Sequence, residues 1–393
     1  MDVSEKKPQR CFKKEISAET LVFSLVFFGI FVLFSWQMGL ANALNTMMNT
    51  AYSLLMETVL YLTAICVIMG AISALLSEFG FVSLANRVLQ PLMRPVFGMP
   101  GAASLGIVTT FLSDNPAILT LTEDRHFRHY FKAYQFPALT NLGTAFGMGL
   151  IVCTFMYSQS TAMGQPLGMA VLVGLLGAVI GSVVSTRLML IFTKRIFGKD
   201  APMAAGGAEN ETPAGMRPVR DGGIGNRVMG ALLDGGHSGV KMGVSIIPGV
   251  LVICTLVMML IKDAPADGYT GGAYEGIALL PTLAGKIDFL LQPFFGFSCP
   301  EAIGVPVTAL GAAGASLGVA SGLIEQGLVG PNDIAVFTAM CMCWSGYLST
   351  HTSMMDSLDC KNLIGKAILS HTIGGLCAGV AAHWIFVLLS TIF

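Results

Sequence analysis

Charged side chains are scarce in this sequence. Asp, Glu, Lys and Arg make up only 11% of its 393 residues, against roughly 25% in an average soluble domain. So few charges cannot cover the water-facing surface of a chain this long, which excludes an ordinary soluble protein. The 22 basic and 23 acidic residues cancel to a net charge of −1, and we predict no nucleic-acid partner.

Disulfide, metal and enzyme signatures are also missing. The sequence has no phosphate-binding loop and no H-E-x-x-H, and its one G-x-S-x-G match, residues 314–318, follows no strand. We therefore expect no enzyme, no metal site and no cofactor beyond a coupling cation, H⁺ or Na⁺. Most cysteines lie in apolar runs, where Cys behaves as a small buried hydrophobe, so no disulfide framework is implied; these are Cys66, Cys153, Cys254, Cys341, Cys343 and Cys377.

Apolar residues are abundant instead. They form 54% of the chain, and the mean hydropathy is +0.71. Seven runs approach or exceed the ~20 residues that a helix needs to cross a bilayer. They lie at about 21–40, 51–76, 133–157, 167–193, 237–262, 334–355 and 367–392. The first is long enough to be an uncleaved anchor rather than a signal peptide.

Two further apolar segments, 101–122 and 300–324, are interrupted by Gly, Pro and small polar residues. Such breaks free backbone groups that lipid cannot satisfy, so these segments are predicted to be re-entrant hairpins buried in protein. The fold class is therefore an all-α polytopic membrane protein, with about seven transmembrane helices and two re-entrant hairpins.

The chain divides into two related halves. Leu89-Gln90-Pro91-Leu92 recurs as Leu291-Gln292-Pro293-Phe294, each just before a hairpin segment. We expect a tail over 1–20, an extra transmembrane helix in 21–48, a first repeat over 49–196 and a second over 237–393. The Gly- and Pro-rich residues 197–236 between the repeats are predicted to be a flexible linker.

The positions of the basic residues predict the topology. If the N-terminus is cytoplasmic and each hairpin returns to its own side, every Lys and Arg except Lys262 and Lys286 falls on the cytoplasmic side, as the positive-inside rule requires. The tail and linker are then cytoplasmic and the C-terminus is outside, in a bacterial inner membrane. Spans 51–76 and 237–262 run in opposite directions, so the repeats are inverted, an arrangement in which secondary transporters build substrate sites.

Polar residues inside the hairpins are the first candidates for a binding site, because an Asp at a helix centre costs about 2.5–3.5 kcal/mol. Asp114 lies between Ser113 and Asn115, and Glu301 follows Cys299. Helix capping explains these residue types equally well. The first tip is expected at 113–116, and the second at either 299–301 or 311–314.

The span behind each hairpin supplies further candidates. They are Thr140 and Asn141 in the first half, and Ser345, Thr350 and His351 in the second. Hydrogen bonds between helices are the alternative role of such residues in membranes. For His351, simple packing and proton relay both stay open.

The pattern of two halves, each with a Gln-Pro word, a broken hairpin and a polar span, resembles the nucleoside-recognition, or Gate, family of bacterial membrane proteins. That family includes parts of concentrative nucleoside transporters, the ferrous iron transporter and spore maturation proteins. Residues 296–303, Gly-Phe-Ser-Cys-Pro-Glu-Ala-Ile, are similar to the gate motif of the iron transporter, but they lack its Asn-Val and the first half has no matching Cys.

The resemblance implies a secondary transporter that moves a small polar solute, of nucleoside type, by alternating access between the repeats. One alternative is a metal-ion permease, motivated by Cys299, Cys341, Cys343 and 23 Met. Another is a membrane assembly protein that transports nothing. The expected partners are the lipid bilayer and the solute or ion, and a homo-oligomer is compatible with the sequence.

Overall fold

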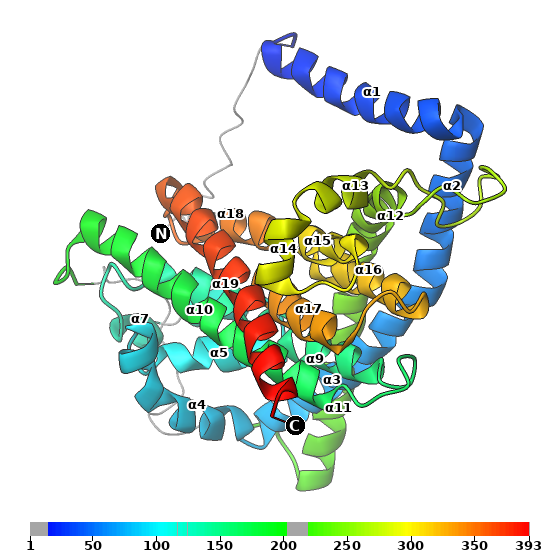
Figure 1. The fold of residues 1–393 in the computed structure, drawn as a ribbon. Coiled ribbons are helices and arrows are strands. Elements are labelled where there is room, and N and C mark those ends of the chain that lie inside the picture. The colour runs from blue at the N-terminus through cyan, green and yellow to red at the C-terminus, as the bar shows by residue number, and fades with distance from the viewer. Residues whose placement is uncertain (1–14, 116, 124, 203–218, 393) are drawn as a thin grey trace.

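The computed structural model describes residues 15–115, 117–123, 125–202 and 219–392 (Figure 1). Within these residues the regular structure is helical, and six helices are long and apolar enough to cross a membrane. This confirms the all-α polytopic class. The six helices span Ala18–Met38, Leu40–Glu78, Ala138–Ser158, Gly168–Phe197, Ile224–Ile261 and Lys361–Ser390. Residues 1–14 of the expected tail and 203–218 of the expected linker lie outside the described residues.

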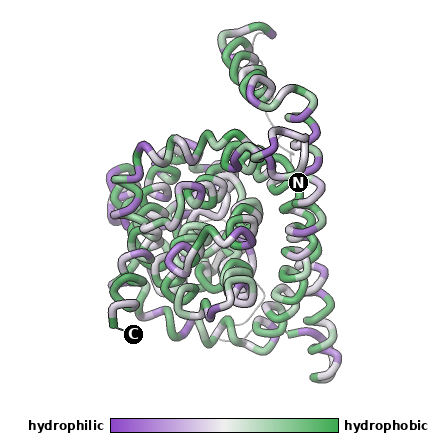
Figure 2. The backbone as a smooth tube through the Cα atoms, turned by 45° about the vertical axis from the view of Figure 1, so that its right-hand side comes forward, coloured by the Kyte–Doolittle hydropathy of each residue, from purple (hydrophilic) through white to green (hydrophobic). Residues whose placement is uncertain are grey.

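The N-terminal helix α1 (Ala18–Met38) projects away from the rest of the molecule (Figure 1). Only 6% of its most apolar stretch is buried, as suits a helix that faces lipid. Gly39, at φ 78°, makes the corner to α2 (Leu40–Ser53), which continues through the π-helical turn η1 (Leu54–Val59) into α3 (Leu60–Glu78). The long helices are coloured mainly as hydrophobic in Figure 2.

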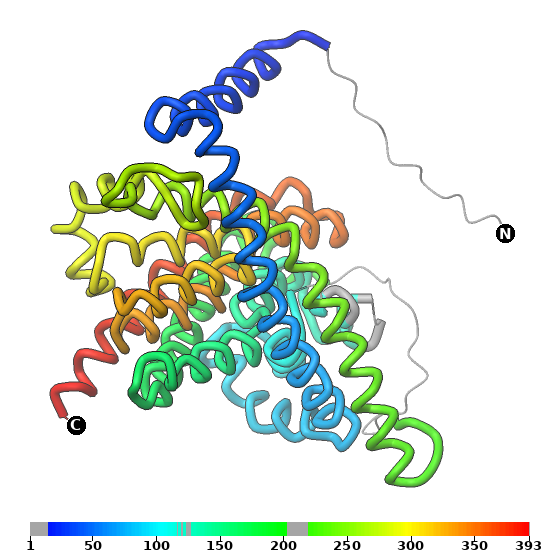
Figure 3. The backbone as a smooth tube through the Cα atoms, turned by 90° about the vertical axis from the view of Figure 1, so that its right-hand side faces the viewer, coloured from blue at the N-terminus to red at the C-terminus, as the bar shows by residue number. Residues whose placement is uncertain are grey.

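Helix α3 packs against α11 (Ile224–Ser245), and the two run side by side in Figure 3. Gly235 approaches Gly70, and Gly239 approaches the backbone of Cys66, so the helices are antiparallel and their backbones nearly touch. Residues 224–236, which we expected in the linker, are therefore part of α11, and Gly235 among them lets the helix pack closely on α3. The helix continues through η3 (Gly249–Cys254) and α12 (Thr255–Ile261).

Two other long helices, α10 (Gly168–Phe197) and α19 (Ile364–Ser390), also pack closely through small residues. Gly181 faces the carbonyl of Gly374. The third span is divided into α8 (Ala138–Thr144) and α9 (Gly149–Ser158). The expected span 334–355 is likewise divided, into α17 (Pro331–Trp344) and α18 (Tyr347–Ser357), and a short turn η5 (Lys361–Leu363) leads to α19.

Both hairpin segments adopt a helix–turn–helix form. Hairpin 1 consists of α5 (Ala103–Leu112) and α6 (Ala117–Glu123), and α7 (Arg125–His129) follows it. Hairpin 2 consists of η4 (Pro300–Ile303), α15 (Gly304–Ala309) and α16 (Ala313–Glu325). The helices before them are α4 (Phe81–Leu92) with η2 (Met93–Phe97), and α13 (Leu279–Lys286) with α14 (Asp288–Phe295). The repeated Gln-Pro words end α4 and α14, in corresponding places.

A polar face of α2 holds the loop of residues 262–278. Asn42 and Asn49 donate to the carbonyls of Tyr269 and Gly271, at 3.1 and 2.8 Å. Glu275 accepts from the Thr270 hydroxyl and from the amides of residues 270–272. Burial alone would raise the pKa of this carboxyl, but these hydrogen bonds outweigh burial and hold the pKa below its ordinary value.

Candidate functional site

Two spans are interrupted inside the helical body, and the interruptions touch each other. Between α8 and α9 the chain unwinds over residues 145–148, with Met148 in the left-handed region at φ 54°. Between α17 and α18 it unwinds at Ser345 and Gly346, at φ 32° and 69°. The Ser345 hydroxyl donates to the Gly147 carbonyl at 3.3 Å. Strained backbone of this kind, at a crossing of two broken helices, is typical of a binding or switching site.

The tip of hairpin 1 inserts into this crossing. The Asn115 side-chain amide donates to the Ser345 carbonyl at 2.8 Å, and the backbone N–H of Asn115 donates to Asp114 Oδ1 at 2.7 Å. Asn115 Oδ1 is enclosed and has no hydrogen-bond partner among the described residues. A methyl group on Gly147 would collide with this carboxamide, so glycine is required for the close approach.

Hairpin 2 reaches the same crossing from another side. The Gly346 N–H donates to the Ala309 carbonyl at 2.8 Å, and a Cβ at Gly346 would meet the Gly311 carbonyl. The second tip is therefore formed by residues 310–312, close to the second of the two expected positions. Both tips and both helix breaks meet at this crossing.

This arrangement gathers polar groups that lipid could not satisfy. The ends of helices leave N–H groups free at one terminus and C=O groups free at the other. Half-helix N-termini favour negative or hydrogen-bond-accepting groups, and unwound carbonyls favour cations. The Asp114 carboxylate and Asn115 Oδ1 add two acceptors. The crossing can therefore bind a neutral polar solute, a small cation, or both.

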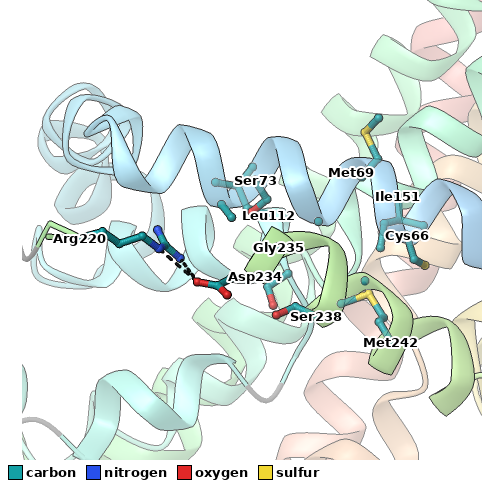
Figure 4. Close-up of a pocket in the computed structure, with 14 residues that line it drawn as sticks. Cys66, Met69, Ser73, Leu112, Ile151, Arg220, Asp234, Gly235, Ser238 and Met242 are labelled. Carbon is teal, nitrogen blue, oxygen red and sulfur yellow. Dashed lines mark hydrogen bonds and ion pairs between the residues drawn. The ribbon is translucent and has the colours of Figure 1, made fainter. Parts of the chain in front are cut away.

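A cavity of about 210 Å³ leads away from the tip of hairpin 1 (Figure 4). Ser113 and Leu112 form one wall, and the facing helices α3 and α11 form the others. At the far end Arg220 pairs with Asp234 at 2.9 Å. Arg220 also pairs with Glu78 at 2.8 Å, on the side of the molecule where we expect the cytoplasm.

Asn141 and His351 belong to a separate polar cluster. The Asn141 amide donates to Ser185 Oγ and to the Ala367 carbonyl, both at 3.0 Å. His371 accepts from Ser185 at Nδ1, 2.8 Å, and donates from Nε2 to the Cys343 carbonyl, 2.6 Å. These contacts connect α8, α10, α17 and α19. The ring of His351 lies 4.5 Å from that of His371, and its nitrogens have no hydrogen-bond partner among the described residues.

Of the other predicted residues, only Thr350 touches the crossing, through the backbone of Gly346. The hydroxyls of Thr140 and Thr350 each donate to a carbonyl in their own helical turn, that of Pro137 and that of Gly346, both at 2.9 Å. Cys299 and Glu301 lie at the base of hairpin 2 rather than at its tip, half-buried. The structure therefore brings Asn115 and Ser345 together, with Asp114 bonded to the Asn115 backbone and Ser113 lining the neighbouring cavity.

The sulfur atoms named for a metal permease are also apart. Cys341 and Cys343 are buried within α17, where Cys341 accepts from Ser316 at 3.2 Å, and Cys299 lies at the hairpin base. In the described part of the chain, no group of three or more His, Cys, Asp or Glu side chains is arranged to hold a metal ion.

Sequence reasoning missed the helix breaks and the Arg220–Asp234 pair. The first had a signal: Gly147-Met148-Gly149 and Ser345-Gly346 place glycine in the middle of apolar spans, where a helix is easily broken. The ion pair had none, because charges fourteen residues apart come together only when the segment before α11 folds back along it.

Comparison with known proteins bears on this site. Residues 59–179, which include hairpin 1 and the first helix break, match the family described as Gate, nucleoside recognition. This confirms the resemblance for that stretch. A solved structure of the concentrative nucleoside transporter CNTnw, a variant in its intermediate 2 state, is 14% identical with a TM-score of 0.50, covering 94% of this chain and 86% of that one.

A second structure of CNTnw, in an inward-facing substrate-bound state, is 13% identical with a TM-score of 0.49, covering 93% of this chain and 83% of that one. At such identities the likeness is one of fold. The chain is a multi-pass membrane protein with the fold of a transporter. No protein of curated function matches it by sequence.

Proposed function

We propose that this protein transports a nucleoside-like polar solute, which binds at the tip of hairpin 1 where the two broken helices cross. The observation that carries the proposal is the contact between Asn115 and Ser345, which joins a hairpin tip to a helix break beside an open cavity. The Gate match over the same hairpin supports the solute class.

The mechanism we propose is alternating access. The 210 Å³ cavity is smaller than the ~300–1,000 Å³ of typical ligand pockets, so a nucleoside needs hairpin 1 to move away from α3 and α11. Release to the cytoplasm also needs the Arg220–Asp234 pair to separate. That pair is partly exposed, so opening it costs little.

A coupling cation, Na⁺ or H⁺, fits the same place. Asn115 Oδ1 has no partner among the described residues, and the Gly147 and Ser345 carbonyls face the crossing with it. Unwound carbonyls of this kind bind coupling ions in other transporters.

Uptake of labelled uridine and adenosine into proteoliposomes tests the proposal. Asp114→Asn and Asn115→Ala should abolish uptake without reducing the yield of monodisperse protein. Asp267→Asn, the same chemical change in an exposed loop, is the matched control and should transport normally. Replacing Na⁺ by K⁺ at constant pH, and varying pH at constant Na⁺, identifies the cation. Wild-type protein that neither binds nor transports a nucleoside would refute the proposal and favour an assembly role.

A further inference from the structure

A second polar pocket lies at the opposite end of the molecule from Arg220. The helix that begins at Ile224, near Arg220, ends at Ile261, and the pocket opens just beyond it. Its volume is about 310 Å³, at the lower end of the range for small-molecule sites. Polar residues from four places line it: Lys262 and Asp263 after α12, Tyr274 in the loop, Glu301 at the base of hairpin 2, and Gln326 just after α16.

Lys262 is the unusual member of this pocket. Its side chain is only 7% exposed, and its Nζ has no hydrogen-bond partner in the part of the chain that the structure describes. Its charge interacts with the carboxylates of Glu301, Glu325 and Asp263, yet none of them forms an ion pair with it there. A buried ammonium group without an acceptor is costly, so an occupant of the gap would be strongly favoured.

The charged groups of the pocket are one pure donor, Lys262, and two pure acceptors, Asp263 and Glu301. An ammonium group only donates hydrogen bonds, and ionised carboxylates only accept them. A simple anion would be repelled by the surrounding carboxylates, and a simple cation by Lys262. A hydroxyl group both accepts and donates, so two neighbouring hydroxyls can bridge the gap.

We propose that this pocket is a second, outer binding site for the solute, in which sugar hydroxyls accept from Lys262 and donate to Glu301. The site rests on the proposed function, because it takes the same solute that the central crossing binds. It is separate from that crossing, since Glu301 and the tip at 310–312 lie at opposite ends of the first arm of hairpin 2.

Equilibrium binding of labelled uridine to the purified full chain tests the proposal. Wild type should bind two molecules per chain, whereas Asn115→Ala and Lys262→Met should each bind one. Met keeps an unbranched stem and removes only the buried charge, so the variant should fold. Lys286→Met, at an exposed lysine nearby, is the control and should bind two. Glu301→Gln should weaken the site that Asn115→Ala retains by about tenfold or more.

The outcomes separate the two proposals. A single site in wild type that Asn115→Ala abolishes and Lys262→Met retains would overturn the outer site and leave the transport function standing. No uridine binding by wild type would overturn both. In Asn115→Ala, D-ribose should compete for the remaining site; competition by glycine instead of ribose would assign the pocket to a zwitterion and overturn the sugar assignment.

Discussion

One methyl group at Gly147 tests whether the crossing is packed as described. In Gly147→Ala the new Cβ would collide with the carboxamide of Asn115. The backbone at Gly147 is not in the left-handed region, so alanine is tolerated there and would gain about 0.4–1 kcal/mol from reduced freedom of the unfolded chain. Overpacking costs about 1–3 kcal/mol, and displacing Asn115 from the Ser345 carbonyl costs about 1–3 more. The expected net destabilisation is about 1–5 kcal/mol.

A double-mutant cycle identifies the cause. Asn115→Ala alone should cost about 1–3 kcal/mol, because it leaves the Ser345 carbonyl unpaired. It also removes the carboxamide that the new methyl group would strike. The destabilisation of the double variant should therefore be smaller than the sum of the two single destabilisations by about 1–3 kcal/mol. Reversible unfolding in mixed detergent micelles measures each value. Gly365→Ala, at a helical glycine with open space around it, should be neutral or stabilising. Strict additivity in the cycle would refute the packing.

Three further predictions concern other parts of the molecule. Gly239→Ala should lower Tm because the new Cβ would strike the backbone of α3. In Gly236→Ala the nearest neighbour of the new Cβ is a methyl group at 3.8 Å, so this variant should raise Tm slightly. Equal Tm values for the two variants would contradict the α3–α11 packing. Because the pKa of Glu275 is depressed in the folded state, its carboxylate stabilises the 262–278 loop above the unfolded pKa of about 4.3, and this stabilisation is lost as the pH falls through the folded-state pKa. The loop amides should lose protection from exchange over that pH range, and Glu275→Gln should abolish this pH-dependent loss of protection. Asn141→Ala should lower Tm, because two buried acceptors lose their donor, and leave the uridine Kd unchanged; a weaker Kd would place Asn141 in the binding site.

Local chemistry predicted much of the first hairpin. The tip at 113–116 was recognisable because a carboxylate, an amide and a proline interrupt an apolar run, and each is costly in lipid. Hairpin 2 was harder to interpret. Glu301 drew attention to its base, whereas the tip at residues 310–312 consists of Leu, Gly and Ala and carries no polar side chain.

The glycines show the same limit. Gly235 and Gly236 are adjacent glycines that the sequence does not distinguish. Gly235 contacts the backbone of α3, whereas Gly236 faces open space beside Val67. Composition alone assigned both to a linker. Which face of a helix is buried depends on its partner, and the partner, α3, lies more than 140 residues earlier in the chain, as the Glu78 to Arg220 contact illustrates.

The sequence by itself determined that this protein lives in a bilayer and that the segments 101–122 and 300–324 cannot be simple spans, because both follow from local hydropathy and from the cost of unsatisfied backbone in lipid. Only the tertiary structure decided which polar residues meet. Asn115 and Ser345 are 230 residues apart, and Lys262 and Glu301 approach one pocket from different elements. Such meetings depend on how the helices pack, and no local pattern encodes that packing.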